Sequence, residues 1–405
     1  MTYPEALAWI YGTQLFGIKL GLESIRRLLE ALAVPDERQR IIHVAGTNGK
    51  GSVCAMVESI ARAQGYRTGL FTSPHLVTFR ERIQVRGEMI AKGEVAEGLT
   101  TIRELVHEWD PHPTFFEIAT ALALHHFRRH DCEVVVLETG MGGRLDATNA
   151  ITPVASVITP IDYDHQKWLG NTLAEIASEK AGIIKSGVPV ISAAQPPEAE
   201  AVIRAQASVC AAPLRFACDA RDDTPIGLAG EHQKQNAALA VAALRAANIQ
   251  VDDDAIARGL ADVKWPARFQ HWNDRIVIDG AHNPAGSRVL AETWRATYGD
   301  ERAVVILATL KDKDALGMIR ALLPIAVRFV LPEVRAERAL APHELATIAA
   351  AAAASSVETA RSFADALEEA EATKMRVLIT GSLHFAGEAL AALSGNPDEL
   401  EDCLQ

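Results

Sequence analysis

Residues 41–52 read IIHVAGTNGKGS, an apolar run that passes directly into a glycine-rich segment. The first part, Ile41 to Ala45, has the length and the β-branched content of a buried strand. A helix is expected to follow over about Val53 to Gln64. A strand, a glycine-rich turn and a helix in this order are typical of a phosphate site at a helix N-terminus. The stretch therefore predicts an α/β fold built around a nucleotide site.

The glycine-rich segment carries the groups that a phosphate site needs. Glycines let the backbone turn tightly, so that successive N–H groups can point at phosphate oxygens. Lys50 adds a point charge, and Ser52 offers a hydroxyl toward bound magnesium. The spacing departs from the usual phosphate loop, because Val44 stands where the first glycine would be and Gly51 separates the lysine from the serine. The structural alternative is a tight turn with an exposed lysine. The predicted nucleotide contacts here are Thr47, Asn48, Gly49, Lys50, Gly51 and Ser52.

Strand-like and helix-like segments alternate through the first 270 residues. Segments with helical periodicity, such as Phe116 to Arg129, separate short apolar runs of strand length. Such alternation predicts a parallel sheet with both faces covered by helices. The further strand candidates are Thr68 to Phe71, Val134 to Leu137, Ala155 to Thr159 and Val188 to Ser192.

A second α/β series begins after residue 270. The expected helix Gln233 to Ala247 is followed by a turn at Trp265 to Arg268 and then by an apolar run at Arg275 to Asp279. We therefore predict a P-loop-type, parallel-sheet ATPase domain over residues 1–270 and a smaller, Rossmann-like α/β domain over 271–405. The strands expected in the second series are Ala303 to Ala308, Arg328 to Leu331 and Arg376 to Thr380.

Composition limits the classes of partner. A chain of 405 residues is long enough for two domains, and a formal charge of −12 argues against general binding to nucleic acid or anionic membranes. The five cysteines are scattered, with no zinc spacing and no disulfide framework, which indicates a reduced cytoplasm. Residues 1–20 lack the apolar core of a signal peptide or membrane span. We expect a cytoplasmic monomer.

Three motifs and the loop together carry a family resemblance. The loop is similar to that of the Mur ligase superfamily, whose members activate carboxylates with ATP. Thr72 to Leu76, Glu138 to Asn149 and Glu179 to Ile183 resemble, in order, motifs of the folylpolyglutamate synthase and dihydrofolate synthase family. They span most of the first predicted domain, and the chain is identified as a member of that family on this set.

The resemblance implies a function. It implies ATP-dependent ligation of L-glutamate to dihydropteroate and to reduced folates, through an acyl phosphate, with ATP and two Mg²⁺ ions as cofactors. These small molecules would be the partners, without nucleic acid or membrane. A folylpolyglutamate synthase without the dihydropteroate activity is one alternative. Others are a muramyl-peptide-type amide ligase, which would share the loop and lysine but not the pterin set, and a nucleotide-binding regulatory protein without turnover.

The end of one strand predicts a metal site. Glu138 directly follows the strand Val134 to Leu137, and ligands of open α/β sheets collect at the carboxyl ends of strands. Mg²⁺ prefers oxygen ligands. The resemblance implies that Ser73 and Glu138 hold one ion and that His165 binds a second. The residues alone leave other readings open, with Glu138 as a loop acid or helix cap, Ser73 as a turn residue and His165 as a structural histidine.

A lysine stands among the implied metal ligands. The ammonium group of Lys180 would repel Mg²⁺, but the resemblance implies that this lysine is carbamylated. Carbon dioxide converts a neutral amine into an oxygen-bearing anion where the surroundings lower the lysine pKa. On sequence alone, a helix-surface lysine paired with Glu179 or Glu175 is favoured. The predicted catalytic residues are Lys50, Lys180 and His165.

Nucleotide contacts are also implied near and beyond the linker. By resemblance, Asn236 would bond adenine, Arg268 would neutralise phosphate, and Asp279 would accept from ribose hydroxyls, with His282 in the same string of residues. Each has a simpler reading as a helix-cap amide, a linker ion pair or a turn aspartate. The family usually has glycine where Ala267 stands.

The acid substrate is the last part of the implied site. Aromatic faces can stack on a flat pterin, and a carboxylate can pair with its aminopyrimidine N–H groups. On the residues alone, Phe115 and Phe116 are core residues at a helix start. The implied substrate-binding residues are Lys19, Leu20, Gly21, Thr114, Phe115, Phe116, Glu117, Leu145, Asp146, Ala147 and Ser382.

Overall fold

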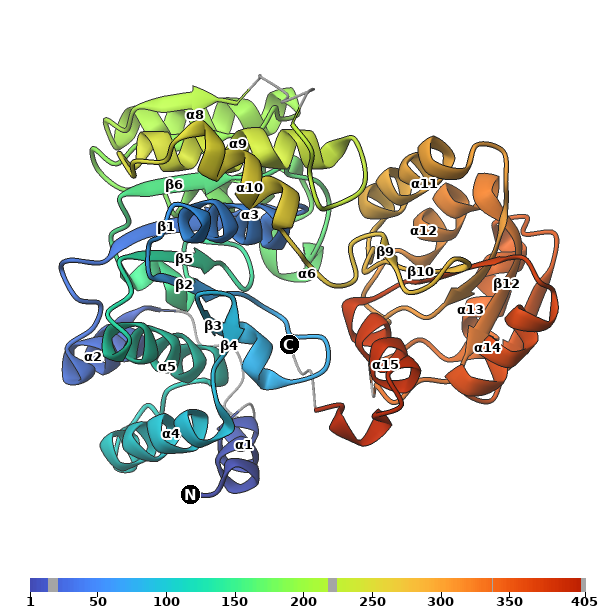
Figure 1. The fold of residues 1–405 in the computed structure, drawn as a ribbon, viewed down its shortest axis with the longest axis horizontal. Helices are drawn as coiled ribbons and strands as arrows, with labels where there is room; N and C mark the ends of the chain where they lie inside the picture. Colours follow the sequence, from blue (N-terminus) through green and yellow to red (C-terminus); the bar gives the residue numbers. More distant parts are fainter. Residues whose placement is uncertain (14–20, 218–223, 337, 402–405) are drawn as a thin grey trace.

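The chain folds into two α/β units that lie side by side (Figure 1). The computed structural model describes residues 1–13, 21–217, 224–336 and 338–401. The predicted alternation of strands and helices is confirmed in both halves. None of the helices among the described residues is long and apolar enough to cross a bilayer.

The first unit is built on an eight-stranded sheet in the order β4-β3-β2-β5-β1-β6-β7-β8. The central strands pair in parallel, whereas β3 and β4 form an antiparallel hairpin at one edge that was not predicted. Every predicted strand forms, within one or two residues of its expected ends. The strands are β1 (Arg40–Ala45), β2 (Thr68–Phe71), β3 (Ile83–Val85), β4 (Glu88–Met89), β5 (Val134–Glu138), β6 (Ala155–Ile158), β7 (Val190–Ser192) and β8 (Leu214–Phe216).

Helices cover both faces of this sheet because its central strands are apolar on both sides. In β1, Ile41 belongs to the core under α2 and α5, and its neighbour Ile42 belongs to the core under α3, α9 and α10. Such double burial is typical of parallel sheets. The helices of the first unit are α1 (Tyr3–Gly12), α2 (Glu23–Leu32), α3 (Lys50–Ala63), α4 (Lys92–Val106), α5 (Phe115–Arg129), α6 (Gln166–Leu169), α7 (Leu173–Ala181), α8 (Pro197–Val209), α9 (His232–Ala246) and α10 (Asp253–Asp262).

The second unit has a six-stranded sheet in the order β13-β12-β11-β14-β10-β9. All pairs are parallel except that of β9 with β10. Its strands are β9 (Gln270–His271), β10 (Ile276–Ile278), β11 (Ala303–Leu307), β12 (Ala326–Pro332), β13 (Val357–Ala360) and β14 (Arg376–Thr380). Its helices are α11 (Pro284–Tyr298), α12 (Ala315–Leu322), α13 (Pro342–Ala351), α14 (Phe363–Ala372) and α15 (Leu383–Leu393).

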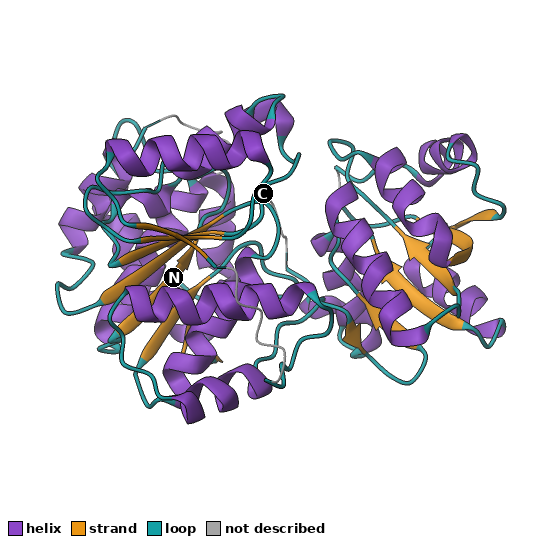
Figure 2. Cartoon of the chain, turned by 90° about the horizontal axis from the view of Figure 1, so that it is seen from above, coloured by secondary structure: helices purple, strands orange, loops and turns teal. Residues whose placement is uncertain are grey.

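Loops run between the two units, which Figure 2 shows from above. The chain leaves the first sheet after β8 and enters the second at β9, in the region of the expected boundary near residue 270. The boundary itself stays a prediction. The loop after β2 also reaches the second unit, because Glu401 N donates to Val77 O at 2.8 Å and Gly387 of α15 lies directly against the Leu76 carbonyl.

The contact between α10 and α3 yields a stability prediction. Ser59 Oγ donates to Gly259 O at 2.8 Å, and a Cβ atom at Gly259 would lie 2.5 Å from the Ile60 Cα atom. Alanine normally stabilises a helix relative to glycine. Here the close approach should reverse the sign, so that Gly259→Ala lowers the free energy of unfolding by about 1–3 kcal/mol through overpacking.

Gly93 in α4 provides the matched control, because a Cβ atom there would meet open space. Urea denaturation of Gly259→Ala, Gly93→Ala and the wild type would measure the difference. A Gly259→Ala protein as stable as Gly93→Ala would contradict the close packing of α3 and α10.

Candidate active site

A cavity of about 430 Å³ opens between the two units, and residues of both line it. It lies where β1, β5 and β6 end, as expected for a ligand site of an open α/β sheet. All of the predicted nucleotide and metal residues line this one cavity, and they are Thr47, Asn48, Gly49, Lys50, Gly51, Ser52, Ser73, Glu138, His165, Lys180, Asn236, Arg268, Asp279 and His282. The structure thus brings together groups that are far apart in the sequence.

The glycine-rich segment forms a tight turn from β1 into α3. Gly46 has φ 148°, and a side chain there would collide with Thr159. Gly49, with φ 88°, precedes the first residue of α3, so the helix begins at Lys50 rather than at Val53. Both glycines therefore occupy backbone conformations that other residues adopt only at a cost. The segment has the shape predicted for a phosphate loop.

The amides of this turn differ in what they bind. Thr47 N and Asn48 N both donate to Pro160 O, at 3.0 and 3.3 Å, so they hold the turn against the loop after β6. The helical hydrogen bonds begin with Val53 N donating to Gly49 O at 2.9 Å. The amides that precede Val53 in the first helical turn have no partner inside the helix and form the positive end of the helix dipole. They are the donors available to a phosphate.

Glu138 and Ser73 lie in contact at the floor of the cavity. Ser73 N donates to Glu138 Oε2 at 3.2 Å, and Glu138 is the last residue of β5 rather than a helix cap. Burial raises the pKa of the Glu138 carboxyl, although Lys50 opposes the shift. Among the described residues, the buried Ser73 hydroxyl has no hydrogen-bond partner. A buried carboxylate beside an unpaired hydroxyl is a donor set that fits a hard cation such as Mg²⁺.

Lys180 is buried rather than exposed on its helix. Its side chain is in the last turn of α7, and its Nζ donates to Gly46 O in the phosphate loop at 2.8 Å. Burial, together with the nearby Lys50 charge, lowers the pKa of Lys180 to about 7. The alternative of a surface lysine is therefore wrong, since Glu179 instead pairs with Arg144 at 2.8 Å. A large fraction of neutral amine is present at neutral pH.

His165 stands at the entrance of α6, with φ 49°. Its Nε2 lies 3.9 Å from Asp164 Oδ1, and burial lowers the pKa of His165 to about 4. The imidazole is therefore neutral at pH 7, which is the form that binds a metal. The ring lines the same cavity as Glu138 and Lys180.

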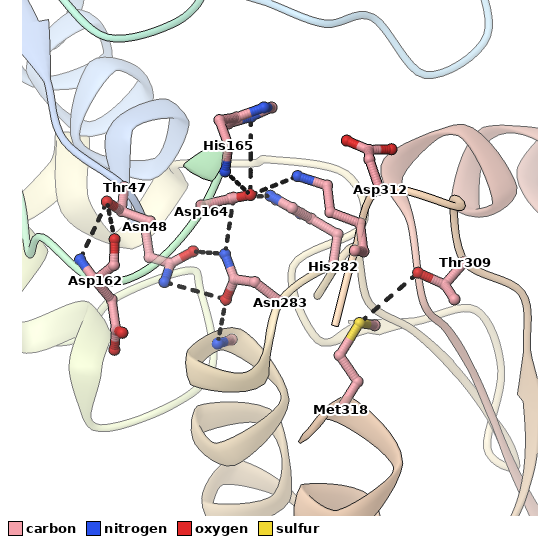
Figure 3. A network of polar contacts seen from close by, with 12 residues as sticks. Thr47, Asn48, Asp162, Asp164, His165, His282, Asn283, Thr309, Asp312 and Met318 are labelled. Carbon is pink, nitrogen blue, oxygen red and sulfur yellow. Dashed lines mark hydrogen bonds and ion pairs between the residues drawn. The ribbon is translucent and has the colours of Figure 1, made fainter. Parts of the chain in front are cut away.

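Asp164 is the centre of a polar network that joins the two units (Figure 3). Its Oδ1 lies 2.6 Å from Lys313 Nζ, and its Oδ2 accepts a hydrogen bond from Asn283 Nδ2 at 3.1 Å. His282 Nε2 lies 3.4 Å from the same Oδ2 atom. Burial opposes ionisation of Asp164, but His282, Lys313 and His165 hold its pKa well below the usual range. The carboxylate is therefore charged in the folded protein.

Three members of this network are missing from the predicted site. Asp164 directly precedes His165, and Asn283 directly follows His282, so their neighbours in the sequence could have indicated them. Lys313 offers no such signal, because only the fold brings the loop after β11 to Asp164. Asn283 also contacts the phosphate loop, since its Nδ2 donates to Asn48 Oδ1 at 3.0 Å.

The remaining predicted nucleotide residues come from the segment between the units and its surroundings. Asn236 lies against the phosphate loop, because its Oδ1 would be 2.8 Å from a Cβ atom on Gly49. Arg268 is enclosed, its pKa is lowered by burial, and its Nη1 donates to Ala267 O at 2.8 Å. Asp279 accepts from the backbone amides of Phe269 and Ala281, at 2.7 and 2.8 Å. Ala267 has φ 54°, so glycine would fit that position without strain.

The predicted acid-binding residues that the structure describes are not among those that line this cavity. Lys19 and Leu20 fall outside the described residues. Thr114 and Glu117 close a capping box at the start of α5, with Thr114 N donating to Glu117 Oε2 at 2.7 Å. Ser382 likewise caps α15 by accepting from Phe385 N at 3.0 Å. The others are not among the residues that line the cavity and are Gly21, Phe115, Phe116, Leu145, Asp146 and Ala147.

Asp146 has a structural task of its own. Its Oδ2 accepts from Gly140 N and Met141 N, at 2.9 and 3.0 Å, and its Oδ1 accepts from the amide and the hydroxyl of Thr148. Burial raises the pKa of the carboxyl, against these hydrogen bonds. Since Gly140 and Met141 line the cavity, Asp146 shapes its wall. A direct contact with a pterin stays a prediction.

Comparison with known proteins agrees with this arrangement. The family model of the Mur ligase middle domain matches residues 44–225, and that of the Mur ligase, glutamate ligase domain matches residues 267–383. The chain is 37% identical, over 420 aligned residues, to the dihydrofolate synthase/folylpolyglutamate synthase of Bacillus subtilis, covering 95% of this chain and 98% of that protein.

Two solved structures extend the likeness to the whole fold. The Mycobacterium tuberculosis folylpolyglutamate synthase complexed with ADP superposes with a TM-score of 0.89 at 32% identity, covering 99% of this chain and all of that one. Escherichia coli FolC in complex with DHPP and ADP gives a TM-score of 0.86 at 30% identity, covering 96% and 98%. The chain therefore belongs to the dihydrofolate synthase/folylpolyglutamate synthase family of the Mur ligase superfamily.

Proposed function

We propose that this protein is an ATP-dependent ligase that joins L-glutamate to dihydropteroate and to reduced folates. The observation that carries the proposal is the single cavity in which a phosphate loop, a buried carboxylate and a buried lysine meet residues of the second unit. The Bacillus relative bears both synthase names, and the Escherichia structure holds DHPP with ADP. The smaller α/β unit, from about residue 271, would act as the glutamate-ligase domain.

In the proposed reaction, the carboxylate of the acid attacks the γ phosphate of ATP, giving an acyl phosphate and ADP. The amine of glutamate then displaces phosphate and forms the amide. Lys50 and Arg268 would stabilise the charge on the transferring phosphoryl group, because Lys50 lines the cavity from the first unit and Arg268 lines it from the segment between the units. Enclosure of the site between the units would keep water from the acyl phosphate.

The donor set supports divalent metal at this site. A relative from Yersinia pestis has been solved with AMPPNP and a Mn ion. We propose that Ser73 and Glu138 hold one Mg²⁺ and that His165, with modified Lys180, holds a second. Bound Mg²⁺ would supply charge stabilisation to the phosphates. Asn236, Asp279 and the other predicted contacts would position the nucleotide.

Lys180 is the residue that we propose to be carbamylated. Its neutral amine would attack carbon dioxide, forming one N–C bond and releasing one proton to solvent. Its burial and its pKa of about 7 favour this reaction, because an ordinary lysine is almost entirely protonated at neutral pH. The product is an anion facing the phosphate loop.

We also propose that the protein works in the cytoplasm as a monomer, on small molecules alone. The scattered cysteines support a reducing compartment, and the net charge of −12 argues against nucleic acid or anionic membranes as partners. Gel filtration at micromolar concentration would test the oligomeric state.

A substrate panel tests the function directly. The wild type should release ADP only when an acid and L-glutamate are both present, and it should incorporate glutamate into dihydropteroate and into a reduced folate. Incorporation into the folate alone would favour a folylpolyglutamate synthase without the second activity. ADP release only with a muramyl peptide would favour that class of ligase, and no release with any pair would favour a regulatory protein.

Asp146→Ala belongs in the same panel. Removal of the carboxylate that holds Gly140 N and Met141 N should displace this wall of the cavity and lower turnover by up to about 10²-fold, the scale of a small misplacement of reacting groups. Because Asp146 shapes the wall of the cavity, both acids should be affected. A loss with dihydropteroate and none with the folate would instead assign Asp146 to pterin recognition.

Lys50→Ala tests the phosphate loop. Removal of one well-placed charge should lower kcat by about 10²-fold or more, measured as ADP release under saturating substrates. Lys92→Ala is the control, because Lys92 is exposed at the start of α4 and lies outside the cavity. Near-wild-type turnover by Lys50→Ala would reject the role of this lysine.

The modification of Lys180 has its own test. Electron density of the ATP-bound enzyme should show extra atoms on Nζ, and Lys180→Ala should regain part of its activity when formate or acetate is added. Lys185→Ala is the control, because Lys185 donates to Asn149 O and does not line the cavity. A bare Lys180 amine in a fully active, ATP-bound enzyme would exclude carbamylation.

A further inference from the structure

A second cluster of potential metal ligands lies away from the cavity, between α4 and α5. It consists of Glu94, His126 and His130. Within the described parts of the chain, it is the one group of at least three His, Cys, Asp or Glu residues whose ligand atoms all lie within 4.8 Å of one another. None of the three lines the nucleotide cavity. The proposed ligase activity therefore does not account for it.

His126 lies in the last turn of α5, and His130, four residues later, is the residue that caps the end of the helix, so the two side chains lie on the same side of it. Their ring centroids are 4.3 Å apart. Glu94 lies in the first turn of α4, the helix that packs beside α5, and its side chain extends toward the two histidines. Two histidines at this spacing, completed by a carboxylate from another segment, are a set of ligands typical of zinc sites.

The distances suit a tetrahedral ion. Glu94 Oε1 lies 2.7 Å from His130 Nε2 and 3.8 Å from His126 Nδ1. Metal–ligand bonds of about 2.0–2.1 Å in a tetrahedron place neighbouring ligand atoms about 3.3 Å apart. The two observed distances bracket that value, and all ligand atoms of the cluster lie within 4.8 Å of one another, so that side-chain rotations could bring the three onto one ion.

The carboxylate is already oriented. Glu94 Oε2 accepts from Ala91 N at 3.3 Å as part of the cap of α4, so the other oxygen, Oε1, faces both imidazoles. The side chain of His126 is only 6% exposed, whereas that of His130 is 40% exposed. The cluster thus has a fixed inner ligand and an outer side open to an incoming ion.

One electrostatic feature agrees with metal binding. Arg129, a cation in the last turn of α5, is paired with Glu97 at 2.8 Å, which reduces its repulsion of an ion.

We propose that Glu94, His126 and His130 bind one divalent transition-metal ion of the zinc class, which holds α4 against α5. Two imidazoles and one carboxylate favour Zn²⁺, Co²⁺ or Ni²⁺ over Mg²⁺. Three protein ligands leave the fourth position to water. The consequence is a stabilising clamp on the face of the first unit that is remote from the phosphate loop.

The test is Zn²⁺ binding to the untagged, full-length protein in millimolar Mg²⁺, measured by calorimetry, with Co²⁺ absorption as a second readout. His130→Ala should lose one equivalent of bound metal or bind it at least about tenfold more weakly. His125→Ala is the matched control, because His125 is the adjacent histidine of the same helix and does not belong to the cluster. It should bind as the wild type does.

Thermal unfolding gives an independent measurement. Zn²⁺ should raise the Tm of the wild type and of His125→Ala by about 2–4 °C, and EDTA should reverse the shift. Glu94→Gln should retain the cap, since glutamine can also serve in a capping box, but lose most of this shift. No binding by the wild type, equal binding by His130→Ala, or an unchanged shift in both cluster variants would each overturn the proposal.

Discussion

The parallel pairing of β1 with β5 is the constraint on which the site depends. Val44 pairs with Glu138, so the phosphate loop after β1 and the carboxylate that ends β5 lie side by side at the carboxyl ends of these parallel strands. β6 pairs in parallel with the other side of β1, so the loop after β6, which carries Asp164, lies at the same carboxyl ends. A shift of one residue in either pair would move these side chains to opposite faces.

Asp164 performs a different task, because it fixes how the two units meet. A buried ion pair such as Asp164 with Lys313 contributes little net stability, since desolvation of both charges offsets their attraction. Removing one partner is far more costly, because it leaves a charge buried without compensation. The contact therefore favours one arrangement of the two units. Asn283 also fixes the position of the phosphate loop in that arrangement, because its amide donates both to Asp164 and to Asn48.

Local patterns predicted the alternation of strands and helices and the turn that forms the phosphate loop. The strand, the glycines and the helix that form the phosphate loop are contiguous, so their period and composition suffice. The burial of Lys180 was not predictable from its neighbours, because the helix that carries it meets Gly46 only through the sheet. Glu117 and Asp146 are the opposite case, in which a sequence motif indicated binding residues but did not reveal their structural hydrogen bonds. A motif identified them, yet in the fold their oxygens serve a helix cap and a loop.

The segment that connects the units has one more consequence. Ala267 and Phe269, on either side of Arg268, have φ of 54° and 46°, which side-chain-bearing residues adopt at a cost of about 1–2 kcal/mol each. Gly280 N donates to Ala267 O at 2.9 Å and ties the segment to the loop after β10. Such a connection is a rigid linker rather than a flexible hinge. A movement of one unit away from the other must therefore bend the chain at another place, or Ala267 and Phe269 must return to ordinary torsion angles. In the second case, Arg268, which lies between them, would rotate as well.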